Sequence, residues 1–305
     1  MKILRFLKFL GLAVLALVAV AGLLLGVGWL YFHPSATWTR GFVYGQRHSE
    51  ALTLDVLKPA APNGLGVLLM VSGSWKSGTN SFQPWMVAPL LRRGYTVLPV
   101  YHVSQPRATV METFEDVSRA TRFIRAHAAD YGIDPDRLGV TGGSAGGHLS
   151  LMLATRGGPG PAEAREAVDR ASSAVQAVAI FYPVTDLLNL GNSTENLHDG
   201  GPPKSFVRAF AQEPRNLPVW RTTGRELSPI YHVTSNLPPT LIYHGDADTL
   251  VPLDQSERFQ VRAQAVGRTV EVVKHPGGQH GWLTMPLGIM KFADWFDAHL
   301  RPAAR

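Results

Sequence analysis

The 305-residue chain contains no cysteine. Disulfide bonds, thiolate nucleophiles and metal sites with cysteine ligands are therefore excluded. Charged residues are scarce, at 17% of the chain, whereas hydrophobic residues make up 45%. This balance excludes extensive disorder and allows a large core. Glycine and proline, with 30 and 22 residues, are too few for a collagen-like or low-complexity chain, and the length fits one α/β domain.

The net charge of +6 suits an acidic partner, such as nucleic acid or a membrane surface, so the position of the charges matters. Lys2, Arg5 and Lys8 precede an uncharged run of 24 residues, from Phe9 to Phe32. Residues 1–33 include no acidic residue, so the rest of the chain carries 26 basic and 23 acidic residues. This near balance removes the main support for nucleic-acid binding, and we expect no nucleic-acid partner.

The uncharged run is long enough to span a membrane, because as a helix it covers roughly 36 Å against about 30 Å of hydrocarbon. We predict that residues 1–34 form an uncleaved signal anchor and that residues 35–305 form the folded domain. The basic flank would stay in the cytoplasm and place that domain on the extracytoplasmic side, periplasmic or extracellular. The alternative is a signal peptide cleaved near Ala19-Val20-Ala21, which would give a secreted protein.

The remaining chain alternates short apolar stretches with amphipathic ones, as a sheet with crossover helices does. Residues 50–57 alternate like a half-buried early strand, and residues 186–226 carry few strand signals and predict an insertion over one end of the sheet. Apolar runs predict further strands at 65–71, 95–101, 137–141, 175–182, 240–244 and 269–274. Helical periodicity predicts helices at 110–130, 145–155, 255–266 and 285–299.

A G-x-S-x-G pattern occurs at Gly142-Gly143-Ser144-Ala145-Gly146. The pentapeptide alone is a weak signal, but it lies between a predicted strand and a predicted helix, which is the setting of a nucleophile elbow. Glycines two residues before and after the serine would let the strand and helix backbones approach closely. We predict Ser144 as a nucleophile; the alternative is a glycine-rich turn with an idle serine.

A serine nucleophile needs a general base and an acid that orients this base. The strand predicted at 240–244 is followed by a loop that contains Asp246 and Asp248. We predict Asp248 as the acid, because Asp246 lies directly after the turn glycine Gly245 and suits the capping of local backbone.

The base is predicted from the loop that follows the last strand, at 269–274. His280 lies between glycines and can reach inward, whereas His275 precedes a proline and closes the strand. The resulting order of serine, aspartate and histidine is that of α/β-hydrolases. A metal pair of His275 and His280 has poor ligand spacing, and we expect structural roles for the remaining candidates His102, His148 and His244.

Small residues in the loop 71–78 would expose backbone N–H groups beside the serine. We predict an oxyanion hole in which Ala145 supplies one donor and Gly73 or Ser74 the other; the alternative is a plain surface turn.

Trp75 and Trp282 follow the predicted oxyanion loop and the predicted base, respectively. Together with Trp85 they are candidates for lining a substrate pocket, although plain core packing suits each of them equally well.

Four segments carry a resemblance to a known family, namely Ser72–Gly78, Tyr131–Arg137, Gly143–His148 and His244–Asp248. They resemble α/β-hydrolases of the acetyl esterase/lipase group, and within it the feruloyl- and acetylxylan-esterase-like branch. The resemblance covers about residues 50–300. It implies an α/β-hydrolase fold with a mostly parallel sheet, helices on both faces and a small cap. It also implies hydrolysis of a small-molecule or carbohydrate-linked ester, with an acetyl or other short or aryl acyl group, through an acyl-enzyme on Ser144 and without cofactor or metal.

Two departures from the family pattern affect the substrate site. The loop H-G-G-G-W of the family is Val71-Ser72-Gly73-Ser74-Trp75 here, and the frequent D-Y-R is Val100-Tyr101-His102. A serine still has a backbone N–H, so the loop can donate, but its support must differ. The family's substrate preference therefore does not carry over.

Two other functions stay open at this stage. A serine peptidase of the prolyl-oligopeptidase type shares the elbow and the residue order, but such enzymes carry a large gating domain before the catalytic one. Here only about 15–20 residues separate the apolar run from the first predicted strand. The altered oxyanion loop also fits a non-catalytic binding protein with a hydrolase fold.

Overall fold

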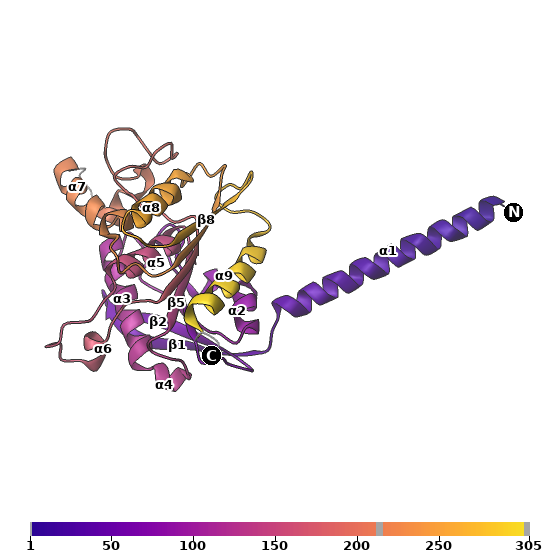
Figure 1. Ribbon diagram of the computed structural model, residues 1–305, viewed down its shortest axis with the longest axis horizontal. Helices are drawn as coiled ribbons and strands as arrows, with labels where there is room; N and C mark the ends of the chain where they lie inside the picture. The colour runs from indigo at the N-terminus through magenta and orange to yellow at the C-terminus, as the bar shows by residue number, and fades with distance from the viewer. Residues whose placement is uncertain (1, 212–215, 302–305) are drawn as a thin grey trace.

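The computed structural model describes residues 2–211 and 216–301. A long N-terminal helix projects from an α/β domain (Figure 1). The helices are α1 (Lys2–Phe32), α2 (Ala88–Arg92), α3 (Val110–Ala126), α4 (Ala128–Tyr131), α5 (Ala145–Arg156), α6 (Ala167–Arg170), α7 (Leu217–Glu226), α8 (Asp254–Gln264) and α9 (Met285–Leu300). The strands are β1 (Ala36–Arg47), β2 (Glu50–Pro59), β3 (Gly66–Met70), β4 (Thr96–Val100), β5 (Leu138–Gly143), β6 (Ala177–Phe181), β7 (Thr240–Gly245) and β8 (Val270–His275).

The strands form one eight-stranded sheet in the order β1-β2-β4-β3-β5-β6-β7-β8. The pairs β1–β2 and β2–β4 are antiparallel, and all pairs from β4 to β8 are parallel. Every strand predicted from the apolar runs is present, with bounds within three residues of the prediction. The predicted mostly parallel sheet is confirmed, and the carboxyl ends of its parallel strands meet at one edge, where sites of such folds lie.

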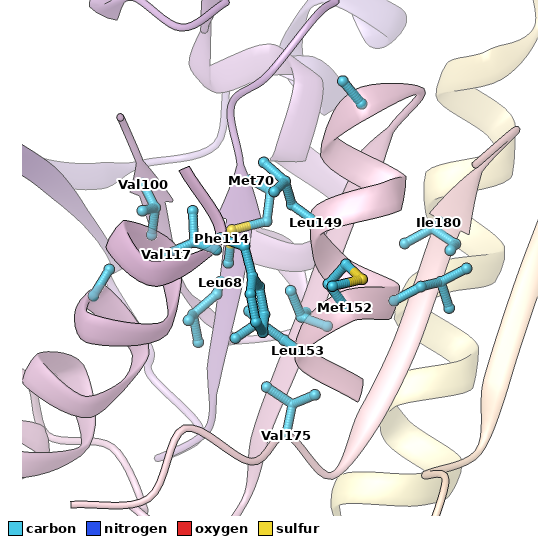
Figure 2. Packing of buried hydrophobic residues seen from close by; sticks show 14 of the residues in the cluster. Leu68, Met70, Val100, Phe114, Val117, Leu149, Met152, Leu153, Val175 and Ile180 are labelled. Atoms are coloured by element: carbon cyan, nitrogen blue, oxygen red, sulfur yellow. The ribbon is translucent and has the colours of Figure 1, made fainter. Parts of the chain in front are cut away.

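Helices cover both faces of the sheet, as predicted. Neighbouring residues of β3 point to opposite faces, so Leu68 lies in one apolar core and Val67 in another. The first core contains side chains of α3, α5 and α8, and Figure 2 shows Phe114 and Val117 of α3 beside Met152 of α5. The second core contains side chains of α2 and α9.

The sequence analysis missed β1, which is the edge strand next to β2. β1 begins at Ala36, directly after α1, so the first strand does not lie 15–20 residues beyond the apolar run. Its apolar pattern is broken by register shifts near Gly41 and Gly45, which hide the strand period. β1 also covers Asp55 of β2, which is 1% exposed and accepts a hydrogen bond from Trp38 Nε1 at 3.0 Å.

Other differences are local. The helix predicted at 110–130 is interrupted at His127, between α3 and α4. In the predicted insertion 186–226, the described residues form 3₁₀ turns and α7 and contain no strand; residues 212–215 lie outside the described part.

Helix α1 includes a segment, Arg5–Phe32, with a mean hydropathy of 2.7, and no residue of its apolar 18-residue window is buried. It is long and apolar enough to cross a membrane, a property that membrane anchors share with signal sequences. The last turn of α1 is attached to α2. The Arg92 guanidinium donates to the carbonyl oxygens of Leu30 and Tyr31 and lies 4.9 Å from the Tyr31 ring centroid. A cation at the C-terminal end of a helix stabilises it.

The close packing of β5 against α9 allows a first prediction, which concerns the stability of the domain. Gly139 has no room for a side chain, because an added Cβ would lie 2.7 Å from Phe296, which is fully buried. We expect Phe296→Ala to lower the free energy of unfolding by about 3–5 kcal/mol, because it leaves a cavity under the sheet. Urea denaturation would measure this, with the exposed α9 variant Lys291→Ala as a control that changes it by less than about 0.5 kcal/mol. Equal values for the two variants would contradict this packing.

Candidate active site

Ser144 lies on a sharp turn between β5 and α5. Its backbone has φ 54° and ψ −119°, a region that L-residues with side chains rarely adopt. The turn is tight because its glycines lack side chains. A Cβ at Gly142 would lie 2.7 Å from the backbone of Gly146, and one at Gly146 would lie 2.4 Å from the Met70 carbonyl oxygen. This strand–turn–helix geometry is that of a nucleophile elbow.

The structure brings Ser144, His280 and Asp248 together from three separate loops. His280 Nε2 lies 2.9 Å from Ser144 Oγ, and His280 Nδ1 lies 2.7 Å from Asp248 Oδ2. Asp248 is 5% exposed, whereas the His280 side chain retains 23% exposure. A hydroxyl, an imidazole and a buried carboxylate in this chain can activate the serine as a nucleophile.

Asp248 is held as a carboxylate. Burial alone would raise its pKa, but hydrogen bonds outweigh burial and hold the pKa well below its usual range. The lowering comes first from the ring of His244, then from the ring of His280 at 2.7 Å and from the backbone N–H of Val251 at 3.0 Å on Oδ1. His244 Nε2 approaches Oδ2 at 3.6 Å. The charge on Asp248 is therefore available to stabilise an imidazolium at His280.

The rival candidates lie elsewhere. Asp246 accepts a hydrogen bond from the backbone N–H of Gly277 and so caps local backbone. His275 is the last residue of β8 and stacks on Trp282, with ring centroids 4.6 Å apart. His244 does lie close to Asp248, but its ring is fully buried, and its two nitrogens are bound to Ser256 Oγ and to the Val251 carbonyl. No group of three or more metal-ligating side chains occurs in the described residues.

The two predicted donors of the loop 71–78 are not equivalent. The N–H of Gly73 donates to the carbonyl oxygen of Lys76 at 3.0 Å and is thus occupied within the loop. Ser74 has a positive φ of 52°, and its N–H has no partner among the described residues. The same holds for the N–H of Ala145 in the first turn of α5, where helix N–H groups lack intrahelical partners. The geometry thus favours Ser74 over Gly73 as the second donor.

Two buried histidines fix the oxyanion loop. His102 donates from Nδ1 to the Val103 carbonyl and accepts at Nε2 from Ser72 Oγ, with both distances 2.9 Å. Ser72 and His102 are both departures from the family pattern, and here they contact each other. The altered loop thus gains a hydrogen bond from within this chain.

His148 of α5 is the second buried histidine that binds this loop, through Trp75. Trp75 Nε1 donates to His148 Nδ1 at 3.2 Å, and His148 Nε2 donates to the Leu227 carbonyl at 2.7 Å. Trp75 is 3% exposed and packs edge-on against Phe206 and Phe210 of the insertion. The indole therefore ties the loop, α5 and the insertion together.

One hollow opens at Ser144, and a second lies next to the preceding residue, Gly143. A small pocket of about 40 Å³ contains Ser144, Ala145 and Ser74 and is closed by apolar side chains such as Leu187 and Phe206. Trp75 also contributes to its lining. The small volume suits a short group.

The second hollow is a cavity of about 770 Å³, which we call the large cavity. It is lined mainly by apolar residues of the segment 81–90, of β3 and of the start of α9, with Gly73, Gly143, Tyr182 and Trp282 at its inner end. Its volume is that of a site for a sizeable organic ligand.

Tyr182 was missed as a site residue by the sequence analysis. It directly follows β6, and its ring lies 4.5 Å from the His280 ring between centroids. Burial, and then the charge of Asp248, raise the pKa of Tyr182 to about 12, so the phenol stays neutral. Its position after a parallel strand at the active edge was the available signal.

The two histidines that hold the loop, His102 and His148, predict how the stability of the protein depends on pH. Burial lowers the pKa of both His102 and His148 from 6.5 to about 4, although a backbone hydrogen bond raises each slightly. The unfolded chain therefore takes up protons first as the pH falls. Their stabilisation is complete above pH 6.5 and is lost between pH 6.5 and 4, by about 1 kcal/mol per pH unit for each ring.

We expect His102→Asn to reduce the slope of unfolding free energy against pH by about 1 kcal/mol per unit between pH 6 and 5. Urea denaturation of the full chain in detergent micelles measures the slope, with His198→Asn at an exposed position as the control. An unchanged slope for His102→Asn would show that this ring is not buried in its neutral form.

Comparisons with known proteins agree with this architecture. LipQ, an esterase of Mycobacterium tuberculosis, is 33% identical over 222 residues, which are 71% of this chain and 50% of LipQ. The chain thus spans about half the length of that relative. Among solved structures, the propionate-bound esterase Est2 from Thermogutta terrifontis has a TM-score of 0.67 at 26% identity, covering 89% of this chain and 97% of Est2.

A truncated carbohydrate esterase from gut microbiota also has a TM-score of 0.67, at 25% identity, covering 87% of this chain and 98% of that one. A family model matches residues 54–262, more than half of the chain and both flanks of the elbow. The chain therefore belongs to the BD-FAE family.

Proposed function

We propose that this protein hydrolyses carboxylic esters of short acids through an acyl-enzyme on Ser144. The observation that carries the proposal is the continuous chain of hydrogen bonds from Ser144 Oγ through His280 to the buried Asp248, at 2.9 and 2.7 Å. Esterases among the relatives and among the similar structures support the same reaction.

In the first half of the reaction, His280 Nε2 takes the proton of Ser144 as Oγ attacks the ester carbonyl carbon. Asp248 holds the tautomer with a proton on Nδ1 and stabilises the imidazolium. The carbonyl oxygen becomes an oxyanion and accepts hydrogen bonds from the N–H groups of Ala145 and Ser74. Each such donor contributes about 3–4 kcal/mol to stabilising the transition state.

The tetrahedral intermediate then expels the alcohol, which takes the proton from His280 Nε2 and leaves the acyl group on Ser144. Water enters, His280 removes its proton, and the attack is repeated on the acyl carbonyl. The carboxylic acid is released and Ser144 is protonated again. The small pocket contains the nucleophile and both oxyanion donors, so the acyl group lies there, and its volume of about 40 Å³ favours acetyl and other short acyl groups.

We further propose that residues 1–34 anchor residues 35–305, the catalytic domain, to a membrane, with that domain on the extracytoplasmic side. The support is the basic N-terminal flank, the apolar length of α1 and the attachment of its last turn to Arg92. Cleavage of the segment as a signal peptide would instead release the domain.

Replacement of the nucleophile tests the proposal directly. We expect Ser144→Ala to abolish labelling by a fluorophosphonate and to lower turnover of p-nitrophenyl acetate by at least about 10⁴-fold. The exposed serine variant Ser205→Ala is the control and should behave like the wild type. An unlabelled but folded wild-type protein would overturn the enzyme assignment, and cleavage of aminoacyl-proline anilides would indicate a peptidase instead.

The oxyanion loop makes a separate prediction. If only the N–H of Ser74 acts, Ser74→Gly should keep kcat/KM within about threefold and raise the unfolding free energy by about 1 kcal/mol, since glycine tolerates the positive φ of 52°. Ser49→Gly, at φ 65° in the turn between β1 and β2, is the matched control for the backbone effect. A loss of activity above tenfold in Ser74→Gly alone would mean that the Ser74 hydroxyl takes part.

A further inference from the structure

A short acyl group does not need the large cavity. The residues that line this cavity indicate which chemical group it can bind. Apolar side chains from three segments face it, including Phe82, Met86, Val87, Leu90 and Ile289. Several of its polar side chains, among them Ser72 and Lys76, belong to the oxyanion loop 71–78, and Thr141 of β5 and Tyr182 supply further ones. A hollow of about 770 Å³ with such walls gains most from an extended hydrocarbon group, since each buried methylene contributes favourably.

The inner end of the large cavity lies beside the proton donor of the proposed reaction. Tyr182 packs on the ring of His280 and also lines the cavity. Trp282, two residues after His280, lines the cavity as well. His280 gives its proton to the leaving alcohol, so the alcohol half of the ester faces this side. The acyl half lies in the small pocket on the other side of Ser144.

The outer end of the large cavity lies beside α1. Trp85 and Pro286 line it and also line a neighbouring hollow of about 300 Å³. The remaining walls of this hollow are Gly28, Trp29 and Phe32 of α1 and His33, which directly follows α1. α2 and α9 lie on the side of the domain from which α1 projects (Figure 1). A route through the large cavity therefore ends where the apolar helix meets the domain.

Exposed apolar side chains occur on the two segments that form this opening: Trp85 and Leu283 line the large cavity, and Leu287 and Met290 are next in sequence to its lining residues Pro286 and Ile289. Leu283 is 96% exposed and Leu287 56%, and Trp85 and Met290 are exposed as well. Such a group of exposed apolar residues marks a surface that contacts an apolar partner. Its position at the end of a helix that can span a bilayer identifies the partner as the membrane.

We propose that the large cavity takes the hydrocarbon chain of a lipophilic alcohol esterified to a short acid, and that this ester enters directly from the bilayer. The inference rests on the proposed ester hydrolysis and names the substrate class for it. Hydrolysis transfers the short acyl group to Ser144 and then to water, and the long-chain alcohol takes the proton of His280 and returns to the membrane.

Binding of the alcohol's hydrocarbon chain in the large cavity is tested with the full-length protein in detergent micelles. The substrates are alkyl acetates from ethyl to hexadecyl acetate. We expect kcat/KM to rise with alcohol length by at least tenfold in total, whereas p-nitrophenyl esters become poorer substrates from acetate to decanoate. Ile289→Trp fills the cavity and should lower the ratio of kcat/KM for hexadecyl acetate to that for ethyl acetate by at least tenfold. Val261→Trp, at an exposed position of α8, should leave the ratio unchanged.

Met86→Trp fills the cavity from the opposite wall and serves if Ile289→Trp does not fold. A flat dependence on alcohol length, or an equal effect of Val261→Trp, would overturn the proposal. These results differ from failure of the proposed function itself, in which the wild-type protein hydrolyses none of the esters and is not labelled by a fluorophosphonate.

Entry from the bilayer is tested with the protein reconstituted in phosphatidylcholine vesicles that contain hexadecyl acetate. Leu283→Asp combined with Leu287→Asp should lower the vesicle rate at least fivefold relative to the rate in micelles, because charge disfavours contact of the opening with lipid. Val261→Asp should leave the ratio of the two rates unchanged. An unchanged ratio in the double variant would overturn the bilayer route.

Discussion

The left-handed turn at Ser144 is the constraint on which the site depends. It exists because Gly142 lets β5 approach α5, and Gly146 lets α5 approach the end of β3, to distances that no side chain permits. The turn is also held from both sides. Gly146 N–H donates to the Ser72 carbonyl at 3.0 Å, and Ser144 N–H donates to the Phe181 carbonyl at 3.1 Å. The turn that carries Ser144 is therefore bound to the loop 71–78 on one side and to the end of β6 on the other.

Contacts with neighbouring elements also explain how the loop 71–78 tolerates serine at positions where the family has glycine. A family loop with several glycines can adopt its shape by itself, whereas Ser74 and Trp75 both carry side chains at positive φ and need support. The support comes from two neutral, buried rings. His102 reaches Ser72 from the end of β4, and His148 reaches Trp75 from α5. A serine and a histidine that each depart from the family pattern thus form one contact.

Features that depend on residues close together in the sequence could be predicted, whereas contacts between residues far apart in the sequence could not. The elbow and the short buried strands are local patterns, so Ser144 and the strand positions follow from their own neighbours. Asp248 could be chosen over Asp246, and the structure indeed brings Asp248 to His280. The sequence could not show contacts such as that of Ser72 with His102, which lie 30 residues apart. It also hid β1, whose period is broken by bulges.

The two hollows beside Ser144 follow from the sheet itself. Residues of a strand alternate between faces, so a nucleophile at the strand end has an apolar core below it on each side. The insertion after β6 fills most of one side, with Val184 and Leu187 in the core of α3, α5 and α8, and leaves only the small pocket. On the other side Phe82 and Val87 belong to the core of α2 and α9, and the space above remains open toward α1. Under the proposed function, the asymmetry of the two sides would distinguish a short acid from a long alcohol, and the same asymmetry would direct the longer group toward α1.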